Sequence, residues 1–203
     1  MICLDFGQGD STKNDPTYIK NLMDTVPQGV VIKFQLFVNH PVLTALKPSV
    51  FYQAWVHGQQ TGKPVTASVF DEASINVMRQ VQVPFYKIAS HEKWYTLIDK
   101  CPDYAPIIVS VDSHVRMLQL ATENMTKHMA FMCCVSEYPA EMEEYERLFT
   151  PMMLAQGISD HTTSTELYEK YRPILWERHY GDRGPDAEHA ITREELLRVM
   201  DVS

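Results

Sequence analysis

Short runs rich in β-branched and aromatic residues alternate along this chain with stretches whose apolar positions recur at helical spacing. The short runs predict β-strands, because they are bounded by polar or turn-forming residues and are too brief for typical helices. Strands are expected at residues 2–6, 30–37, 65–70, 85–89, 107–111, 130–135, 156–160 and 174–179. The stretches between them predict helices.

Local signals mark where several of these helices begin. Asp15 followed by Pro16 is typical of a helix start, because proline fits the first turn of a helix. Asp71 is placed to cap another helix, and Thr192 with Glu195 forms a capping box for the last one. The chain therefore alternates strand and helix from end to end.

This alternation predicts a parallel sheet, because each helix carries the chain back to the start of the next strand. Eight strand and helix units favour a closed (β/α)8 barrel, the TIM barrel, over an open sheet. With 203 residues, the chain is close to the lower limit of about 200 for such barrels. We therefore expect a compact α/β barrel with short loops, formed as one domain by residues 1–203.

Charge and composition exclude several classes of partner. The 18 basic and 26 acidic residues give a net charge of −8 without a cluster of lysines or arginines, so neither nucleic acid nor a membrane is an expected partner. The N-terminus has no basic segment before an apolar core, and no apolar run approaches the ~18 residues of a membrane-spanning helix. We expect a cytoplasmic protein. The four cysteines lack metal-binding spacing, which predicts reduced thiols.

Two histidines lie at the carboxyl ends of the last two predicted strands, where barrel enzymes place their active sites. Ser159 and His161 share one face of their strand, and Glu177 and His179 share one face of the next, because alternate residues of a strand point the same way. Neutral imidazoles from neighbouring strands can share a divalent cation. The histidines are therefore candidate metal ligands, and the alternative is that they are hydrogen-bonded structural residues.

Lys33 and Lys87 lie inside the second and fourth predicted strands, where a lysine needs a carboxylate or a bound anion as partner. Serines follow several strands and would surround the lysines at the barrel mouth. Together these groups predict a clamp for phosphate or carboxylate. The pattern leaves open that the lysines instead neutralise interior carboxylates such as Glu177 and Asp160.

Taken in chain order, these segments resemble the N-acetylneuraminate (sialic acid) synthase family. The matching motifs extend over nearly the whole chain, which makes them a specific signal when taken together. They are Lys33-Phe34-Gln35, Ala67-Ser68-Val69-Phe70-Asp71, Val83-Pro84-Phe85-Tyr86-Lys87-Ile88-Ala89-Ser90, Ser136-Glu137-Tyr138-Pro139, Gly157-Ile158-Ser159-Asp160-His161-Thr162, Glu177-Arg178-His179-Tyr180 and Gly184-Pro185-Asp186.

Members of this family are (β/α)8 barrels that condense phosphoenolpyruvate with an open-chain N-acetylhexosamine, usually N-acetylmannosamine. The resemblance implies a metal-dependent transferase that forms a nonulosonic acid and phosphate. Mn²⁺ is the expected cofactor, with Mg²⁺ or Co²⁺ as alternatives. A divalent Lewis acid suits the polarisation of the sugar aldehyde that this reaction requires.

The resemblance also implies a role for each site residue. The implied metal ligands are His161, His179 and Asp5, and the implied catalytic residues are Lys33, Lys87 and Glu92, with Glu92 transferring a proton. The substrates would be bound by Gln35, Ser68, Ser90, Ser110, Ser136, Tyr138, Ser159 and Asp186. Within this set, the two lysines and Ser68, Ser90, Ser110 and Ser159 would hold phosphoenolpyruvate, whereas Gln35, Glu92, Tyr138 and Asp186 would face the sugar.

The sequence departs from the family pattern at its first strand and beyond its last helix. The family motif of glutamate, isoleucine, glycine, any residue, asparagine and histidine reads here as Asp5-Phe6-Gly7-Gln8-Gly9-Asp10, so the first carboxylate is one carbon shorter. Family enzymes also carry a C-terminal antifreeze-like domain, whose arginine reaches the partner subunit's site and which these 203 residues do not contain. We therefore expect either a homodimer or a separate antifreeze-like partner chain.

Two other functions stay open on the sequence alone. One is a non-catalytic barrel that acts as a binding or scaffold protein, which the altered first strand would suit. The other is a metal-dependent lyase or aldolase acting on a sugar acid, since barrel folds support many reactions. Only the condensation consumes phosphoenolpyruvate and liberates inorganic phosphate, so product analysis separates these functions.

Overall fold

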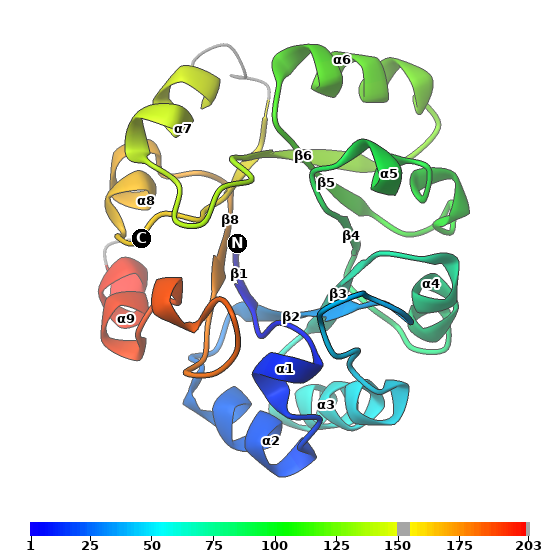
Figure 1. The fold of residues 1–203 in the computed structure, drawn as a ribbon, viewed down its shortest axis with the longest axis vertical. Coiled ribbons are helices and arrows are strands. Elements are labelled where there is room, and N and C mark those ends of the chain that lie inside the picture. The colour runs from blue at the N-terminus through cyan, green and yellow to red at the C-terminus, as the bar shows by residue number, and fades with distance from the viewer. Residues whose placement is uncertain (150–154, 202–203) are drawn as a thin grey trace.

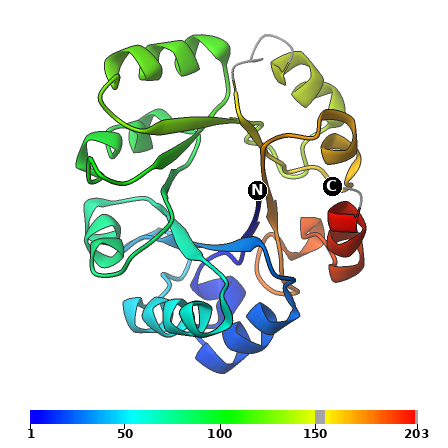
Figure 2. The same ribbon diagram turned by 180° about the vertical axis from the view of Figure 1, so that it is seen from behind.

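The computed structural model describes residues 1–149 and 155–201, which form a ring of parallel strands surrounded by helices (Figures 1 and 2). Each strand pairs with the next in chain order, and the last pairs with the first, so that eight strands close into a barrel. The strands are β1 (Ile2–Asp5), β2 (Val30–Leu36), β3 (Val65–Val69), β4 (Tyr86–Ile88), β5 (Ile107–Val111), β6 (Met129–Cys134), β7 (Gly157–Ser159) and β8 (Leu175–His179). The predicted (β/α)8 barrel is confirmed, and the strand ends lie within one or two residues of those expected.

The helices form the outer layer of the barrel (Figure 1). The α-helices are α1 (Gly9–Thr12), α2 (Pro16–Thr25), α3 (Pro48–Thr61), α4 (Glu72–Arg79), α5 (Glu92–Tyr95), α6 (His114–Glu123), α7 (Met142–Phe149), α8 (Glu166–Tyr171) and α9 (Arg193–Asp201), and the 3₁₀ turns are η1 (Ile98–Lys100) and η2 (Ala187–His189). The expected caps are present: Asp15 accepts from two backbone amides of α2, and Asp71 accepts from one of α4. Thr192 and Glu195 exchange side-chain and backbone hydrogen bonds before α9.

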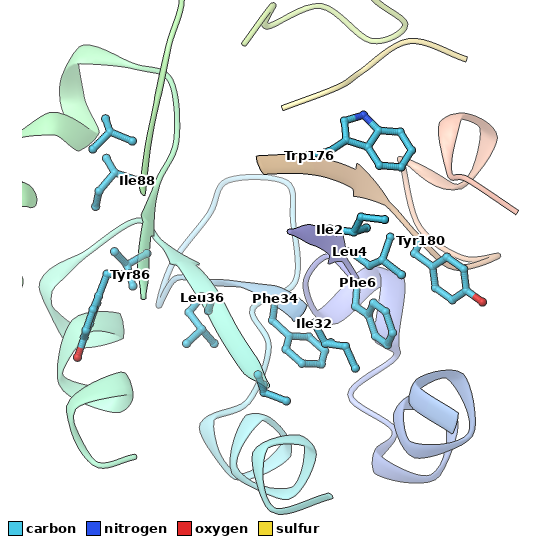
Figure 3. Close-up of a cluster of buried hydrophobic side chains, with 14 of the residues drawn as sticks. Ile2, Leu4, Phe6, Ile32, Phe34, Leu36, Tyr86, Ile88, Trp176 and Tyr180 are labelled. Carbon is cyan, nitrogen blue, oxygen red and sulfur yellow. The ribbon is translucent and has the colours of Figure 1, made fainter. Parts of the chain in front are cut away.

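The main hydrophobic core lies between the strands and the helices. Leu4, Ile32 and Phe34 occupy alternate positions of β1 and β2, and Figure 3 shows Ile32 and Phe34 pointing outward toward the surrounding helices. Phe34 packs edge-on against Phe51 of α3, with 6.1 Å between the ring centroids. Burying such side chains stabilises the fold by about 1.5–3 kcal/mol each.

A second and smaller hydrophobic cluster contains the strand residues of the opposite parity. Because side chains alternate between the two faces of a strand, this cluster lies on the inner face of the barrel. It consists of Cys3, Val31, Phe85, Ile108 and Met132. The next residues on the same faces, two positions further along each strand, are Asp5, Lys33, Lys87, Ser110 and Cys134. The interior of the barrel therefore has an apolar layer, followed by a more polar layer nearer the carboxyl ends of the strands.

No helix in the described parts of the chain combines the length and the apolar character needed to cross a bilayer.

Candidate active site

A cavity of about 410 Å³ opens at the carboxyl ends of the strands, where function is expected in a (β/α)8 barrel. Every residue predicted for the site contributes to its wall except Glu92. The structure thus brings together Asp5, Lys33, Gln35, Ser68, Lys87, Ser90, Ser110, Ser136, Tyr138, Ser159, His161, His179 and Asp186. These residues come from all eight strands or the loops that follow them.

Lys33 lies between two buried carboxylates inside this cavity. Its Nζ is 2.7 Å from Oδ2 of Asp5 and 3.7 Å from Oε1 of Glu177, and it also donates to Oγ of Ser68 across 2.9 Å. Burial alone would favour the neutral amine, but the two carboxylates outweigh it and raise the pKa of Lys33 above its ordinary value. The same attraction outweighs burial at Asp5 and holds the pKa of that carboxyl below its usual range. Lys33 and Asp5 are therefore both charged at neutral pH.

Lys87 is less completely paired than Lys33. Its Nζ donates to Oγ of Ser110 across 2.6 Å and to the carbonyl oxygen of Ile88 across 3.4 Å, and the nearest carboxylate oxygen is Oε1 of Glu177 at 3.9 Å. Glu177 also accepts a hydrogen bond from Ser159 at 2.9 Å. Because 3.9 Å is too long for a hydrogen bond, the ammonium group of Lys87 keeps donor capacity for a bound anion.

The sequence suggested Glu177 and Asp160 as neutralising partners of the lysines, and the structure corrects the second. Asp160 points away from the cavity, where it lies 3.1 Å from Nη1 of Arg178 and accepts from Nε1 of Trp176. The reason is the alternation along the chain, because Ser159 faces inward and its neighbour must face outward. Glu177 is thus the carboxylate of β8 that joins the interior network.

Asp5 contacts several donors in the structure. Its Oδ1 accepts from the backbone amide of Gly7 at 2.9 Å, and its Oδ2 accepts from Lys33 and from Nε2 of Gln35. Nδ1 of His179 lies 3.8 Å away, which is an electrostatic contact rather than a hydrogen bond. Asp5 therefore holds Lys33 and Gln35 in place and lies beside one predicted metal ligand. Its own ligation of a metal stays a prediction.

His161 is held in one tautomer by its surroundings. Its Nδ1 lies 2.5 Å from the carbonyl oxygen of Val135, and since a carbonyl can only accept, Nδ1 carries the proton. The lone pair is then on Nε2, which lies 2.7 Å from the hydroxyl of Tyr138. Burial, reinforced by the nearby His179, lowers the pKa of His161 to about 3. The ring is therefore neutral at physiological pH, as a metal-ligating imidazole must be.

His179 completes the pair of imidazoles. Its ring centroid is 6.0 Å from that of His161, and its Nδ1 lies 3.7 Å from a carboxylate oxygen of Asp186. Burial raises the pKa of Asp186 above its ordinary value, although His179 opposes the shift. Within residues 1–149 and 155–201, no three His, Cys, Asp or Glu side chains form a ready metal cluster. The donor chemistry nevertheless fits a divalent ion held by the two imidazoles, with its other positions open to substrate and water.

Glu92 is the one predicted site residue that the structure places elsewhere. It is the first residue of α5, its side chain is 77% exposed, and its carboxylate forms an ion pair with Arg116 of α6. It does not line the cavity. Proton transfer by Glu92 stays a prediction, and it would require the carboxylate to leave Arg116.

Sequence reasoning did not assign several other lining residues to the site. Glu177 was recognisable, because it lies two positions before His179 on the same strand face. Cys134 follows the same rule, since it lies two positions before Ser136. Phe70 and Ala89 follow it as well, since they lie two positions after Ser68 and Lys87. The loop residues Gln8, Leu43 and Pro185 carried no such signal.

The closed barrel with its polar cavity at the carboxyl ends of the strands places this chain in the class of (β/α)8-barrel proteins. Within that class, the model of the NeuB family matches residues 42–201, and the chain belongs to the NeuB family. No curated protein sequence matches the chain.

Solved structures of related proteins share the fold. The N-acetylneuraminic acid (sialic acid) synthetase of Leptospira borgpetersenii serovar Hardjo-bovis, in complex with citrate, superposes with a TM-score of 0.76 at 18% identity, over 98% of this chain and 81% of that chain. The spore coat polysaccharide biosynthesis protein spsE of Bacillus subtilis gives 0.73 at 20% identity, over 99% of this chain and 66% of that one. A putative spore coat polysaccharide biosynthesis protein E of Chromobacterium violaceum gives 0.75 at 16% identity, with 98% and 72% covered.

Proposed function

We propose that this protein has a sialic-acid-synthase-like role in sugar biosynthesis and condenses phosphoenolpyruvate with an open-chain N-acetylhexosamine. The observation that carries this proposal is the meeting of two buried lysines and two imidazoles in one cavity. The first pair suits an anionic donor, and the second suits a metal ion that activates a carbonyl group. Membership of the NeuB family supports the same reaction class.

The lysines and serines would hold phosphoenolpyruvate. Lys33 and Lys87 present positive charge in a buried cavity, where attraction to a phosphate or carboxylate is stronger than in water. Ser68 and Ser110 already contact the two ammonium groups, and their hydroxyls orient them. In this proposal Lys87 carries most of the new contact, because its carboxylate partner is more distant than those of Lys33.

His161 and His179 would hold the divalent cation, for which we propose Mn²⁺, with Mg²⁺ or Co²⁺ as alternatives. When bound, such an ion supplies a Lewis acid that polarises the sugar aldehyde. The tautomer set by the carbonyl of Val135 directs the lone pair of His161 to Nε2, on the side where Tyr138 lies. Gln35, Tyr138 and Asp186 would then face the acceptor sugar.

The proposed reaction forms one carbon–carbon bond and releases one phosphate. The enol carbon of phosphoenolpyruvate attacks the aldehyde carbon, water adds to the resulting cation, and phosphate leaves. One water molecule is consumed for each phosphate released, and the product is a nonulosonic acid. We further propose that the protein acts either as a homodimer or with a separate antifreeze-like chain.

Calorimetry with metal-free protein tests this function. Titration with Mn²⁺ and then with phosphoenolpyruvate should show metal-dependent binding in the wild type. His161→Ala/His179→Ala should lose it, whereas His57→Ala should keep it, because His57 lies on α3 and pairs with Asp24.

An assay for phosphate release with N-acetylmannosamine and related amino sugars completes the test. Release that requires both the sugar and phosphoenolpyruvate supports the condensation. Ligand binding without release across the sugar panel would favour a non-catalytic barrel. Cleavage of a sugar acid without consumption of phosphoenolpyruvate would favour a lyase or aldolase.

A further inference from the structure

The side-chain amide of Gln8 is a buried hydrogen-bond donor in a residue that lines the cavity. Gln8 is only 1% exposed, and it lies in the cavity wall. Among the described residues, none accepts a hydrogen bond from its Nε2. Buried donors are almost always paired, and leaving one unpaired costs about 1–3 kcal/mol. A protein can tolerate this cost at a binding site, because a bound ligand supplies the missing acceptor.

The oxygen end of this amide is paired within the protein. Its Oε1 accepts a hydrogen bond from the hydroxyl of Ser11 at 3.1 Å, which leaves Nε2 as the free end. The carbonyl oxygen of Gln8 accepts from the backbone amide and the hydroxyl of Thr12, at 3.0 and 2.9 Å. The next residue, Gly9, donates its amide to the carbonyl oxygen of Thr44 at 2.9 Å. The donor therefore belongs to a residue whose following peptide group is held at both its carbonyl oxygen and its amide.

Gly9 also explains why this anchoring is so close. A Cβ atom at this position would lie 2.6 Å from the carbonyl oxygens of both Thr44 and Ala45. Only glycine allows the turn after β1 to contact the loop after β2 at this distance. Gln8 and Leu43, which belong to these two loops, both line the cavity.

The two glutamines of the cavity differ in the way that matters for binding. Nε2 of Gln35 already donates to Asp5 at 2.9 Å, so its hydrogen-bonding capacity is partly used within the protein. Nε2 of Gln8 has no such partner in the described parts of the chain. A ligand oxygen can therefore pair with Gln8 without breaking an existing hydrogen bond.

The place of Gln8 in the barrel indicates which substrate it meets. It follows β1, whose neighbours are β2 and β8, whereas Lys87 and Ser110 lie on β4 and β5 across the ring. The loop after β1 packs beside the loop after β8, where Gly7 and Asp186 line a common small pocket. Gln8 is thus on the side of His179 and Asp186, away from the less completely paired lysine.

We propose that the amide of Gln8 donates a hydrogen bond to an oxygen atom of the acceptor sugar and selects for acceptors that carry this oxygen. This inference rests on the proposed function, in which Gln35, Tyr138 and Asp186 face the acceptor sugar. A hydroxyl or an acyl carbonyl oxygen satisfies the donor. An acceptor that lacks this oxygen leaves the donor buried and unpaired, and is disfavoured for that reason.

The test compares Gln8→Leu with Gln60→Leu, a change of an exposed glutamine on α3 that lies outside the cavity. Gln8→Leu should raise the KM for N-acetylmannosamine by about 3- to 10-fold, the loss expected for one neutral hydrogen bond. The affinity for phosphoenolpyruvate, measured by calorimetry, should stay as in the wild type. The Tm of the ligand-free variant should equal or exceed that of the wild type, because an unpaired buried donor has been removed. Gln60→Leu should leave all three quantities unchanged.

A second variant separates substrate contact from packing. Ser11→Ala removes the hydroxyl that orients the amide while Gln8 itself stays, and it should raise the KM for the sugar by less than Gln8→Leu does. An unchanged KM in Gln8→Leu together with a lower Tm would overturn the inference, because Gln8 would then serve the fold alone. A wild type that releases no phosphate would overturn the proposed function itself, whatever the Tm of Gln8→Leu.

Discussion

The hydroxyl of Tyr138 lies 2.7 Å from Nε2 of His161, and the two rings stack with 4.0 Å between their centroids. Because the proton of His161 is on Nδ1, Tyr138 must be the donor in this contact. Partial desolvation of the hydroxyl, reinforced by neighbouring acidic groups, raises the pKa of Tyr138 above its ordinary value, so the hydroxyl keeps its proton at neutral pH. The tyrosine thus contacts the same lone pair that a metal ion would use.

Replacing Tyr138 by phenylalanine should therefore strengthen metal binding. The substitution keeps the ring that stacks on His161 and removes only the hydroxyl that competes for Nε2. The gain should be about 2- to 10-fold in Mn²⁺ affinity, corresponding to one neutral hydrogen bond that no longer has to be broken. Calorimetric titration of Tyr138→Phe beside the wild type measures it. Weaker binding would show that Tyr138 supports the metal site rather than competing with it.

Replacing either lysine should change the stability of the protein by a different amount, although both lysines face the cavity. Lys33→Met removes the cation that lies between Asp5 and Glu177 and leaves two buried carboxylates near each other, which should destabilise the protein by about 3–5 kcal/mol. Lys87→Met breaks only the longer contact with Glu177 and should cost clearly less. Thermal unfolding compares the two variants.

Phosphoenolpyruvate binding gives the second comparison between the lysines. Lys87→Met should abolish measurable binding in calorimetry even though the variant is folded, because the less completely paired ammonium group is gone. If Lys87→Met bound phosphoenolpyruvate as the wild type does, the lysines would form a structural network alone. That alternative was already open from the sequence.

The barrel and most of its cavity were predictable because side chains along a strand alternate between its two faces, so that every second residue points the same way. The interior position of Lys33 predicts that Gln35 faces inward as well, and Ser159 predicts the same for His161. The same rule, applied strictly, also predicts that Asp160 faces outward. Apart from Asp160, the residues that we expected at the barrel mouth from their positions within or directly after strands line the cavity wall.

The positions of residues outside the strands are set by tertiary contacts that no local sequence pattern predicts. Glu92 begins a helix, and its direction is set by Arg116, which is 24 positions away in the chain. Gln8 reaches the cavity because Gly9 contacts the loop after β2 at Thr44. Such positions depend on tertiary packing, and they are the ones that sequence reasoning misplaced or missed.

The contact between Asp10 and Thr44 should make the stability of the cavity rim depend on pH. The carboxylate of Asp10 accepts from the backbone amide and the hydroxyl of Thr44, at 2.6 and 2.8 Å, and these hydrogen bonds lower the pKa of Asp10 below its ordinary value of 3.8. A carboxyl with a lowered pKa in the folded state stabilises the protein above its unfolded-state pKa, and this contribution is lost as the pH falls through the folded value.

Asp10→Asn should therefore lower the Tm by about 1–3 °C at pH 7, as expected for partial loss of one exposed charge-assisted hydrogen bond. The difference between variant and wild type should shrink as the pH falls below 3.8. Scanning calorimetry at several pH values measures it. A difference that is constant from pH 7 to pH 3 would mean that the charge of Asp10 does not contribute.

Gly157 lies where the two strands that lead to His161 and His179 pair most tightly against a residue without a side chain. A Cβ atom there would lie 2.5 Å from Cβ and 2.6 Å from the carbonyl oxygen of Leu175, at the point where β7 pairs with β8. Both atoms belong to the neighbouring strand and cannot rotate away. Gly157→Ala should therefore push the two strands apart and destabilise the barrel by about 1–3 kcal/mol, or roughly 2–12 °C in Tm.

The strand separation should also reach the site, because β7 leads to His161 and β8 ends at His179. Metal affinity in the folded fraction of Gly157→Ala should fall, since the hydrogen bond from Ser159 to Glu177 that ties these strands together would lengthen. Gly29→Ala is the control, because Gly29 has φ +83 but nothing within 4 Å of an added Cβ atom. That variant should have a backbone cost of about 1–2 kcal/mol and wild-type metal affinity. Equal metal affinity in the two variants would show that the imidazole pair tolerates movement of β7.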